Sequence, residues 1–193
     1  MNFVPSSEKA KEWGISQRRV AILCKEGRVP GIADKLYPPQ ERKLEKVKKY
    51  WKLIIGLEPV REIYGNEILT EKDISIDHFV PWSYVAHDEM WNLNPTTKTI
   101  NSSKSNNLPD WETYFERLAR QEYQSYQLMW KYDQVHKEFE KCAKEHINSD
   151  DIKYRVYHQG LEYNEFAGEL KSVISPVYQS AKNCGFSSWQ IRI

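Results

Sequence analysis

Apolar residues recur at intervals of three and four over two long stretches of the chain, and this spacing predicts helices. The first stretch covers 41–57 and the second covers 110–147. The apolar faces are formed by Leu44, Val47, Trp51, Ile54 and Ile55 in the first stretch, and by Trp111, Phe115, Leu118, Tyr126, Met129, Trp130, Phe139, Cys142, Ala143 and Ile147 in the second. We therefore expect a helix on either side of the segment between them.

Beyond Ile147 the pattern predicts more helices. Residues 148–151 interrupt the apolar stripe and supply a cap for the next helix. Helices are expected over 161–172 and 177–182, divided near Pro176 because proline disrupts a helix interior, and Gly185 is expected to end the last one. The aromatic residues of this region are expected to form the core of a helical layer, with a docking face for a partner or nucleic acid as the alternative.

The first 35 residues predict two short helices, over 8–13 and 17–26, joined by a tight turn at Gly14-Ile15-Ser16. Gln17, Arg18 and Arg19 open the second helix. The segment resembles the helix-turn-helix of mercury-resistance regulators and excisionases, in which that end enters the major groove of DNA. The resemblance implies that these three side chains contact bases or phosphates. The wing that usually comes next is not visible, so packing on a partner is the alternative.

The segment 60–109 has a different residue pattern, with short apolar runs and many Asn, Ser and Thr residues. This composition indicates a compact unit with short strands. The whole chain is therefore expected to have an α+β fold that is predominantly helical. We divide it into a helix-turn-helix segment (1–35), a linker and basic helix (36–60), the irregular unit (61–109) and a helical C-terminal region (110–193).

Composition and charge limit the compartment and the kinds of partner that are expected for this chain. The chain has 193 residues, 40% of them hydrophobic, which suffices for a packed core. No run of about 18 apolar residues and no secretory signal is seen, so no membrane partner is expected. Three separated cysteines fit a reducing cytoplasm. Residues 1–60 carry 13 Lys and Arg against 7 Asp and Glu, which suggests a polyanion contact or else a solvated helix face.

The candidate catalytic and metal-binding residues lie between Ile74 and Pro109. Asp77 and His78 are adjacent, and an Asn-rich run lies downstream of them. Aspartate is a hard oxygen ligand suited to Mg²⁺ or Mn²⁺, while neutral histidine, with an ordinary pKa of about 6.5, can take a proton from water. Lys98 and Lys104 could face phosphates. These residue types fit phosphodiester hydrolysis, although an Asp-His pair by itself is more often structural.

The full string from Asp77-His78 through Pro81, Asn92-Leu93-Asn94-Pro95 and Asn101-Ser102-Ser103-Lys104 to Leu108-Pro109 resembles the HNH nuclease family. The resemblance covers 61–109 and implies a small ββα-metal unit embedded between helices. It implies that Asp77 and Asn101 bind one Mg²⁺ or Mn²⁺ ion and that His78 is the general base. Asn92 would orient the His78 ring through the loop between the strands, and Asn94 is a weaker substitute for it.

Many members of that family hold this unit with a structural zinc on two Cys pairs. The matching positions here are Arg61, Tyr64, Thr97 and Ile100, none of which can replace a thiolate on zinc. We therefore expect no structural zinc, with the flanking helices giving support instead.

The resemblance implies an endonuclease that cuts DNA to leave a 5′-phosphate and a 3′-hydroxyl, in a setting such as bacterial or phage defence. Two alternatives stay open: a helix-turn-helix DNA-binding protein, and a nuclease subunit of a larger defence complex that is inactive alone. DNA is the expected partner. A second copy of the chain or a partner in a defence complex is not decided by the residues.

Overall fold

The computed structural model describes residues 43–85 and 87–191. The chain divides into two compact units, one of residues 42–82 and 87–193 and the other of residues 1–41 and 83–86. The structure describes nearly all of the first unit. Of the second unit it describes only 83–85, which belong to the short helix α4 (Trp82–Val85). The predicted helix-turn-helix, including Gln17, Arg18 and Arg19, lies outside the described residues.

A ββα unit lies at the centre of the fold. Strand β1 (Ser75–His78) pairs antiparallel with β2 (Leu93–Thr96), with Ser75 opposite Thr96 and His78 opposite Leu93. A short 3₁₀-helix, η2 (Met90–Asn92), leads into β2, and helix α5 (Lys98–Lys104) comes after it. The hydroxyl of Thr97 accepts a hydrogen bond from the Ile100 N–H at 3.3 Å and so caps α5. The expected short strands in 60–109 are thereby confirmed.

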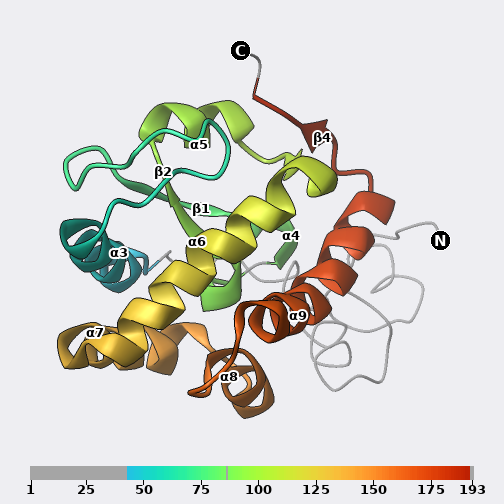
Figure 1. Cartoon of the computed structure of the whole chain (residues 1–193). Helices are drawn as coiled ribbons and strands as arrows, with labels where there is room; N and C mark the ends of the chain where they lie inside the picture. Colours follow the sequence, from blue (N-terminus) through green and yellow to red (C-terminus); the bar gives the residue numbers. More distant parts are fainter. Residues whose placement is uncertain (1–42, 86, 192–193) are drawn as a thin grey trace, which may run out of the picture. The chain divides into compact units, whose positions relative to one another are not determined.

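Helices surround this unit, as Figure 1 shows. Helix α3 (Glu45–Leu57) packs on α7 (Asp133–His146) and on both strands, and α6 (Trp111–Lys131) packs between α7 and α9 (Tyr163–Asn183). Helix α8 (Asp150–Tyr157) packs on α9. The apolar stripe of α3 buries Val47, Tyr50, Trp51 and Ile54, which confirms the spacing read from the sequence. The fold is thus predominantly helical α+β.

Two helix boundaries differ from the expectation. The stretch 110–147 is two helices, because Tyr132 adopts an extended conformation between α6 and α7. The predicted division near Pro176 is wrong, because α9 continues through the proline. Its buried side chains keep the three-to-four spacing on both sides of that position, as Phe166, Leu170, Ile174, Tyr178 and Ala181. The cap predicted after 148 is confirmed, since the Ser149 hydroxyl accepts from the Ile152 N–H at 3.4 Å.

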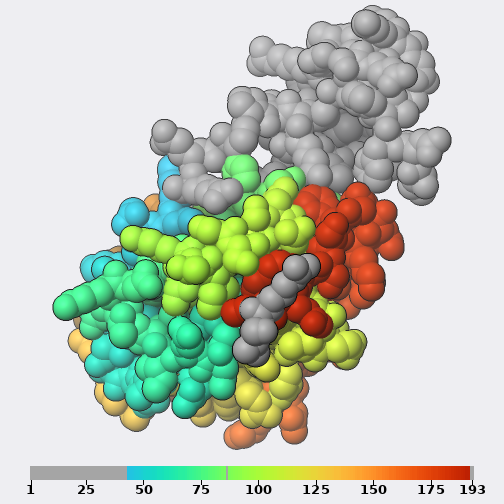
Figure 2. Space-filling view, turned by 90° about the horizontal axis from the view of Figure 1, so that it is seen from above, coloured from blue at the N-terminus to red at the C-terminus, as the bar shows by residue number. Residues whose placement is uncertain are grey.

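The C-terminal segment returns to the ββα unit, which the sequence did not predict. Strand β3 (Leu108–Pro109) pairs in parallel with β4 (Ser188–Trp189). The Trp189 ring lies edge-on to Tyr64, with 5.3 Å between the centroids. In the space-filling view of Figure 2 the surface of α5 lies beside the segment that precedes β1 and beside this C-terminal strand. Four other aromatic side chains of the last third are buried in the core, as expected for a covering layer: Phe139, Tyr157, Phe166 and Tyr178.

No helix within 43–85 and 87–191 combines the length and the apolar character that a membrane crossing would need.

Candidate active site

The end of β1 carries the Asp-His pair. Asp77 lies opposite Asn94 of β2, and His78 lies opposite Leu93. Adjacent residues of a strand point to opposite faces, so the two side chains have different surroundings. Asp77 is 4% exposed and His78 is 5% exposed. At this burial, most polar atoms of the pair need partners inside the protein.

Asn92 ties down the loop that comes after β1. Its side-chain Oδ1 accepts a hydrogen bond from the Val80 N–H at 2.7 Å, and its Nδ2 donates to the Val80 carbonyl at 2.9 Å. The Phe79 N–H donates to the Asn92 carbonyl at 2.9 Å. These three bonds fix the backbone immediately after His78. These bonds go to Val80 and Phe79, so orientation of the His78 ring by Asn92 stays a prediction.

Helix α5 brings Asn101 to β1. Its Nδ2 donates to the Ser75 Oγ at 2.8 Å and to the Ile76 carbonyl at 3.1 Å. Because these two acceptors hold Nδ2, the Oδ1 atom is the one that could coordinate a metal ion. Asn101 therefore lies against the strand that carries Asp77, as the ββα arrangement requires.

Asp77 already has two strong partners. The Tyr64 hydroxyl donates to Oδ2 at 2.6 Å, and the Lys104 Nζ donates to Oδ1 at 3.2 Å. The same ammonium group donates to the His78 carbonyl at 2.8 Å. Burial, together with the negative charge of Asp77, holds the pKa of Tyr64 well above its usual value, so the hydroxyl stays a donor.

The His78 ring is held from the other side by Asp88. Its Nε2 lies 2.7 Å from the Asp88 Oδ1. Burial raises the pKa of Asp88, but the hydrogen bond and charge of His78, with the Lys43 N–H and the charge of His146, outweigh this and leave that pKa below its usual value. An ionised carboxylate therefore faces the ring.

The predicted phosphate contacts lie in two different surroundings. Lys98, at the start of α5, is exposed, whereas Lys104 at its end is 0% exposed and bound to Asp77. A phosphate contact by Lys104 stays a prediction, and it requires the ammonium group to leave the carboxylate. The basic face of α3 is partly neutralised, because Lys46 pairs with Glu145 and Lys49 with Glu138 on α7.

Two of the positions matched to zinc ligands by the sequence resemblance, Arg61 and Thr97, have other roles. Arg61 forms a backbone bridge with Ile68, and Thr97 caps α5. Between them the buried Glu62 carboxylate accepts from the Tyr64 and Gly65 N–H groups and, at 3.1 Å, from the Thr96 hydroxyl. Burial raises the pKa of Glu62 against the opposing effect of these bonds. This carboxylate links the segment before β1 to the end of β2.

Metal-ligating groups are sparse in the described residues. No cluster of three or more His, Cys, Asp or Glu side chains suited to a metal ion occurs within 43–85 and 87–191. Asp77 and Asn101 offer a carboxylate and an amide oxygen, which are ligands that Mg²⁺ and Mn²⁺ accept. The donor chemistry fits such an ion, provided that it displaces or shares the partners of Asp77.

Several residues of the site had no signal in the sequence. Tyr64 lies 13 residues before Asp77, and Asp88 lies 10 residues after His78 in a connecting segment. The His146 ring is also buried at the site, with Nδ1 3.2 Å from the Asp88 carbonyl oxygen and Nε2 3.1 Å from that of Lys43. Only the tertiary fold brings these side chains together.

Comparison with known proteins agrees with this geometry. Neither the curated proteins nor the solved structures gave a match to the chain. A family model described as HNH endonuclease matches residues 61–110, about a quarter of the chain. That segment holds β1, β2 and α5 together with Asp77, His78, Asn92 and Asn101. The chain therefore contains an HNH domain, which points to a nuclease.

Proposed function

We propose that this protein is a metal-dependent endonuclease that hydrolyses phosphodiester bonds of DNA, with His78 as the general base. The observation that carries the proposal is the convergence at β1: His78 ends the strand, and Asn101 of α5 hydrogen-bonds to residues of the same strand as Asp77. These are the base and oxygen ligands that one-metal phosphodiester hydrolysis requires.

The protein residues have separate tasks in this reaction. Neutral His78 takes a proton from a water molecule, and the oxygen of that water forms a bond to phosphorus. The bond from phosphorus to the 3′ oxygen breaks, and that oxygen takes a proton from solvent. The products carry a 5′-phosphate and a 3′-hydroxyl. Asn92 keeps the His78 backbone in place, because it holds both polar groups of Val80.

Asp77 and Asn101 would hold a divalent ion. When bound, Mg²⁺ or Mn²⁺ supplies positive charge that stabilises the phosphate and the leaving oxygen. In the described structure Lys104 places a positive charge on the same carboxylate. Lys98 is exposed beside these residues along α5 and would contact a neighbouring phosphate.

A second candidate is a nuclease that is inactive until a partner engages it. It is favoured by one observation: Asp77 and His78 are nearly inaccessible, at 4% and 5% exposure. A base and a metal ligand that are so enclosed must become accessible before DNA can reach them. A role in bacterial or phage defence stays a prediction, as does assembly with a second copy.

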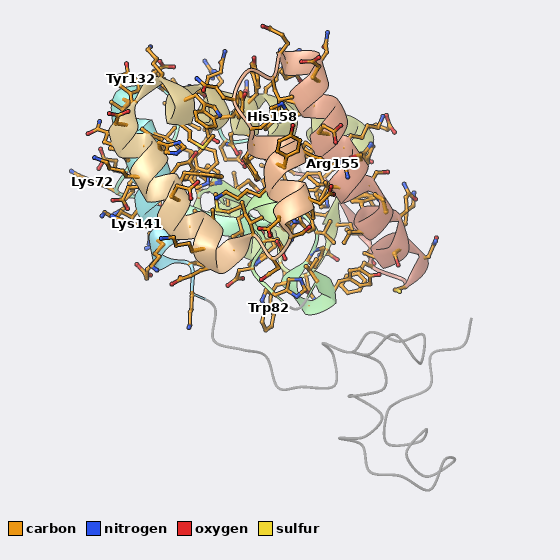
Figure 3. All side chains as sticks on the ribbon, turned by 90° about the horizontal axis from the view of Figure 1, so that it is seen from below. Lys72, Trp82, Tyr132, Lys141, Arg155 and His158 are labelled. Carbon is orange, nitrogen blue, oxygen red and sulfur yellow. The ribbon has the colours of Figure 1, made fainter. Side chains whose placement is uncertain are left out.

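Incubation of the full chain with supercoiled plasmid tests the proposal. We expect nicking with Mg²⁺ or Mn²⁺, none with EDTA, and none by His78→Ala. The matched control is His158→Ala: Figure 3 shows His158 at the opposite side of the view from Trp82, which lies shortly after β1 in the chain. Metal-dependent nicking that survives His78→Ala would exclude His78 as the base. A folded wild type that binds DNA but never cuts it would favour the partner-gated alternative.

A further inference from the structure

Three separate segments converge on one carboxylate next to His78. Asp88 accepts from the His78 ring through Oδ1 at 2.7 Å and from the Lys43 N–H through Oδ2 at 3.2 Å. Its carbonyl oxygen lies 3.2 Å from Nδ1 of His146, the last residue of α7. The Nε2 of that histidine in turn lies 3.1 Å from the Lys43 carbonyl oxygen. The segment before α3 and the end of α7 therefore fix Asp88 from two sides.

The neighbouring residue is fixed as well. The Glu89 Oε1 accepts a hydrogen bond from the Asn148 Nδ2 at 2.6 Å. Asn148 lies just beyond the end of α7, so two consecutive residues of the segment before η2 are tied to the end of that helix. Asp88 is therefore held through its side chain, its backbone and its neighbour.

The contact to His78 determines which ring nitrogen can act. An ionised carboxylate only accepts hydrogen bonds, so the Nε2 at 2.7 Å must carry a proton. In the neutral ring the other nitrogen, Nδ1, then has no proton and is the basic one. Among the described residues nothing forms a hydrogen bond to Nδ1 of His78.

From this geometry we infer that Asp88 is the positioning residue of the general base: it holds His78 in the tautomer protonated on Nε2 and leaves Nδ1 to take the proton of the attacking water. The inference rests on the proposed function. It also assigns a role to the C-terminal helices, since α7 holds Asp88 through His146. A carboxylate behind a histidine fixes both tautomer and ring orientation, and it stabilises the imidazolium that forms.

Two substitutions at this position separate positioning from packing. Asp88→Asn keeps the size and shape of the side chain but removes the charge, and its amide can donate to Nε2 and so favour the wrong tautomer. Asp88→Glu keeps the carboxylate but adds a methylene. If Asp88 only packed, the isosteric Asn variant would be the milder change. If Asp88 positions His78, Asp88→Glu retains more activity than Asp88→Asn.

The experiment measures kcat and KM for plasmid nicking by the full chain with Mn²⁺, for wild type, both variants and Asp133→Asn as a control at an exposed position. For Asp88→Asn we expect kcat to fall by about 10²- to 10⁴-fold with KM little changed, since tautomer control acts on the proton transfer. We expect Asp88→Glu to recover part of kcat and the control to match wild type. An Asn variant as active as wild type, or more active than the Glu variant, would overturn the inference.

A second measurement does not depend on cutting. Nitrogen-15 NMR of histidine-labelled protein reports which ring nitrogen carries the proton, and the signals missing from His78→Ala identify His78. We expect Nε2–H in wild type and a change toward Nδ1–H in Asp88→Asn. An Nδ1–H ring in wild type, or no change in the variant, would overturn the inference. If the wild type cuts no DNA, the proposed function fails, while these spectra still decide whether Asp88 sets the tautomer.

Discussion

The Lys104 ammonium nitrogen lies 3.2 Å from Oδ1 and 3.1 Å from Oδ2 of Asp77, and both residues are buried. The ion pair joins the end of α5 to the end of β1, so the helix and the strand are held together by charge as well as by packing. It also places the carboxylate proposed for metal binding under a positive charge that belongs to the protein.

Replacement of Lys104 tests this relationship. Lys104→Met leaves the Asp77 carboxylate buried without a counter-charge, and we expect the free energy of unfolding to fall by about 3 kcal/mol. If Asp77 binds a divalent ion, Mn²⁺ should raise the melting temperature of this variant more than that of wild type. Thermal unfolding with and without Mn²⁺ measures both effects. Lys98→Met is the matched control, since that lysine is exposed on the same helix, and it should change neither quantity.

Asn92 gives a prediction about the loop after β1. Asn92→Asp still accepts from the Val80 N–H but can no longer donate to the Val80 carbonyl, and it places a charge where the side chain is 0% exposed. We expect the free energy of unfolding, measured in urea, to fall by at least about 2 kcal/mol. The Val80 carbonyl loses its hydrogen-bond donor, and the new carboxylate is buried without a positive partner. Asn107→Asp removes a similar donor to the Lys104 carbonyl at a half-buried position and should cost less. Equal losses in the two variants would contradict a special role for Asn92.

The sequence predicted the helices of this fold well where one apolar stripe faces the core. The prediction failed at Pro176. A proline inside a helix costs about 3 kcal/mol locally, and the rule based on this cost takes no account of tertiary packing. In α9 the buried residues on both sides of the proline, such as Ile174 and Tyr178, belong to one continuous face. Burial of that face offsets the missing hydrogen bond, and no local pattern reports this.

The site divides in the same way. Asp77, His78, Asn92 and Asn101 stood out because they lie in one short string, and the ββα unit is built from that string. Tyr64 and Asp88, by contrast, reach the site through contacts that the sequence does not mark. His146 reaches Asp88 across 58 positions of the chain. Such partners depend on how the helices pack, so single-sequence patterns cannot reveal them.

Lys98 gives a prediction about DNA binding. If its ammonium group contacts a phosphate, Lys98→Ala should weaken binding equally for unrelated DNA sequences and reduce the slope of log affinity against log salt by about 1. Fluorescence anisotropy of labelled duplexes in EDTA, over a series of salt concentrations, measures both. Lys171→Ala, at an exposed position of α9, is the control. An unchanged salt slope in Lys98→Ala would place this lysine outside the DNA contact.

Glu122 of α6 gives a prediction about pH. Its side chain is buried, its Oε1 has no hydrogen-bond partner among the described residues, and burial holds its pKa well above the usual value. A carboxyl group whose pKa is raised by folding contributes stability that is fully present below its unfolded pKa. That contribution is lost as pH rises from there toward the folded pKa, because the unfolded state releases the proton more readily.

Glu122→Gln removes this proton without changing the shape of the side chain. We therefore expect the variant to gain stability over wild type as pH rises from 5 toward 8, by at most about 1.4 kcal/mol for each pH unit. Urea unfolding at a series of pH values measures the difference. Glu112→Gln, at an exposed position of the same helix, should show a difference that stays nearly constant. A difference for Glu122→Gln that is independent of pH would contradict the prediction. It would mean that the carboxyl group ionises in the folded protein as readily as in the unfolded one.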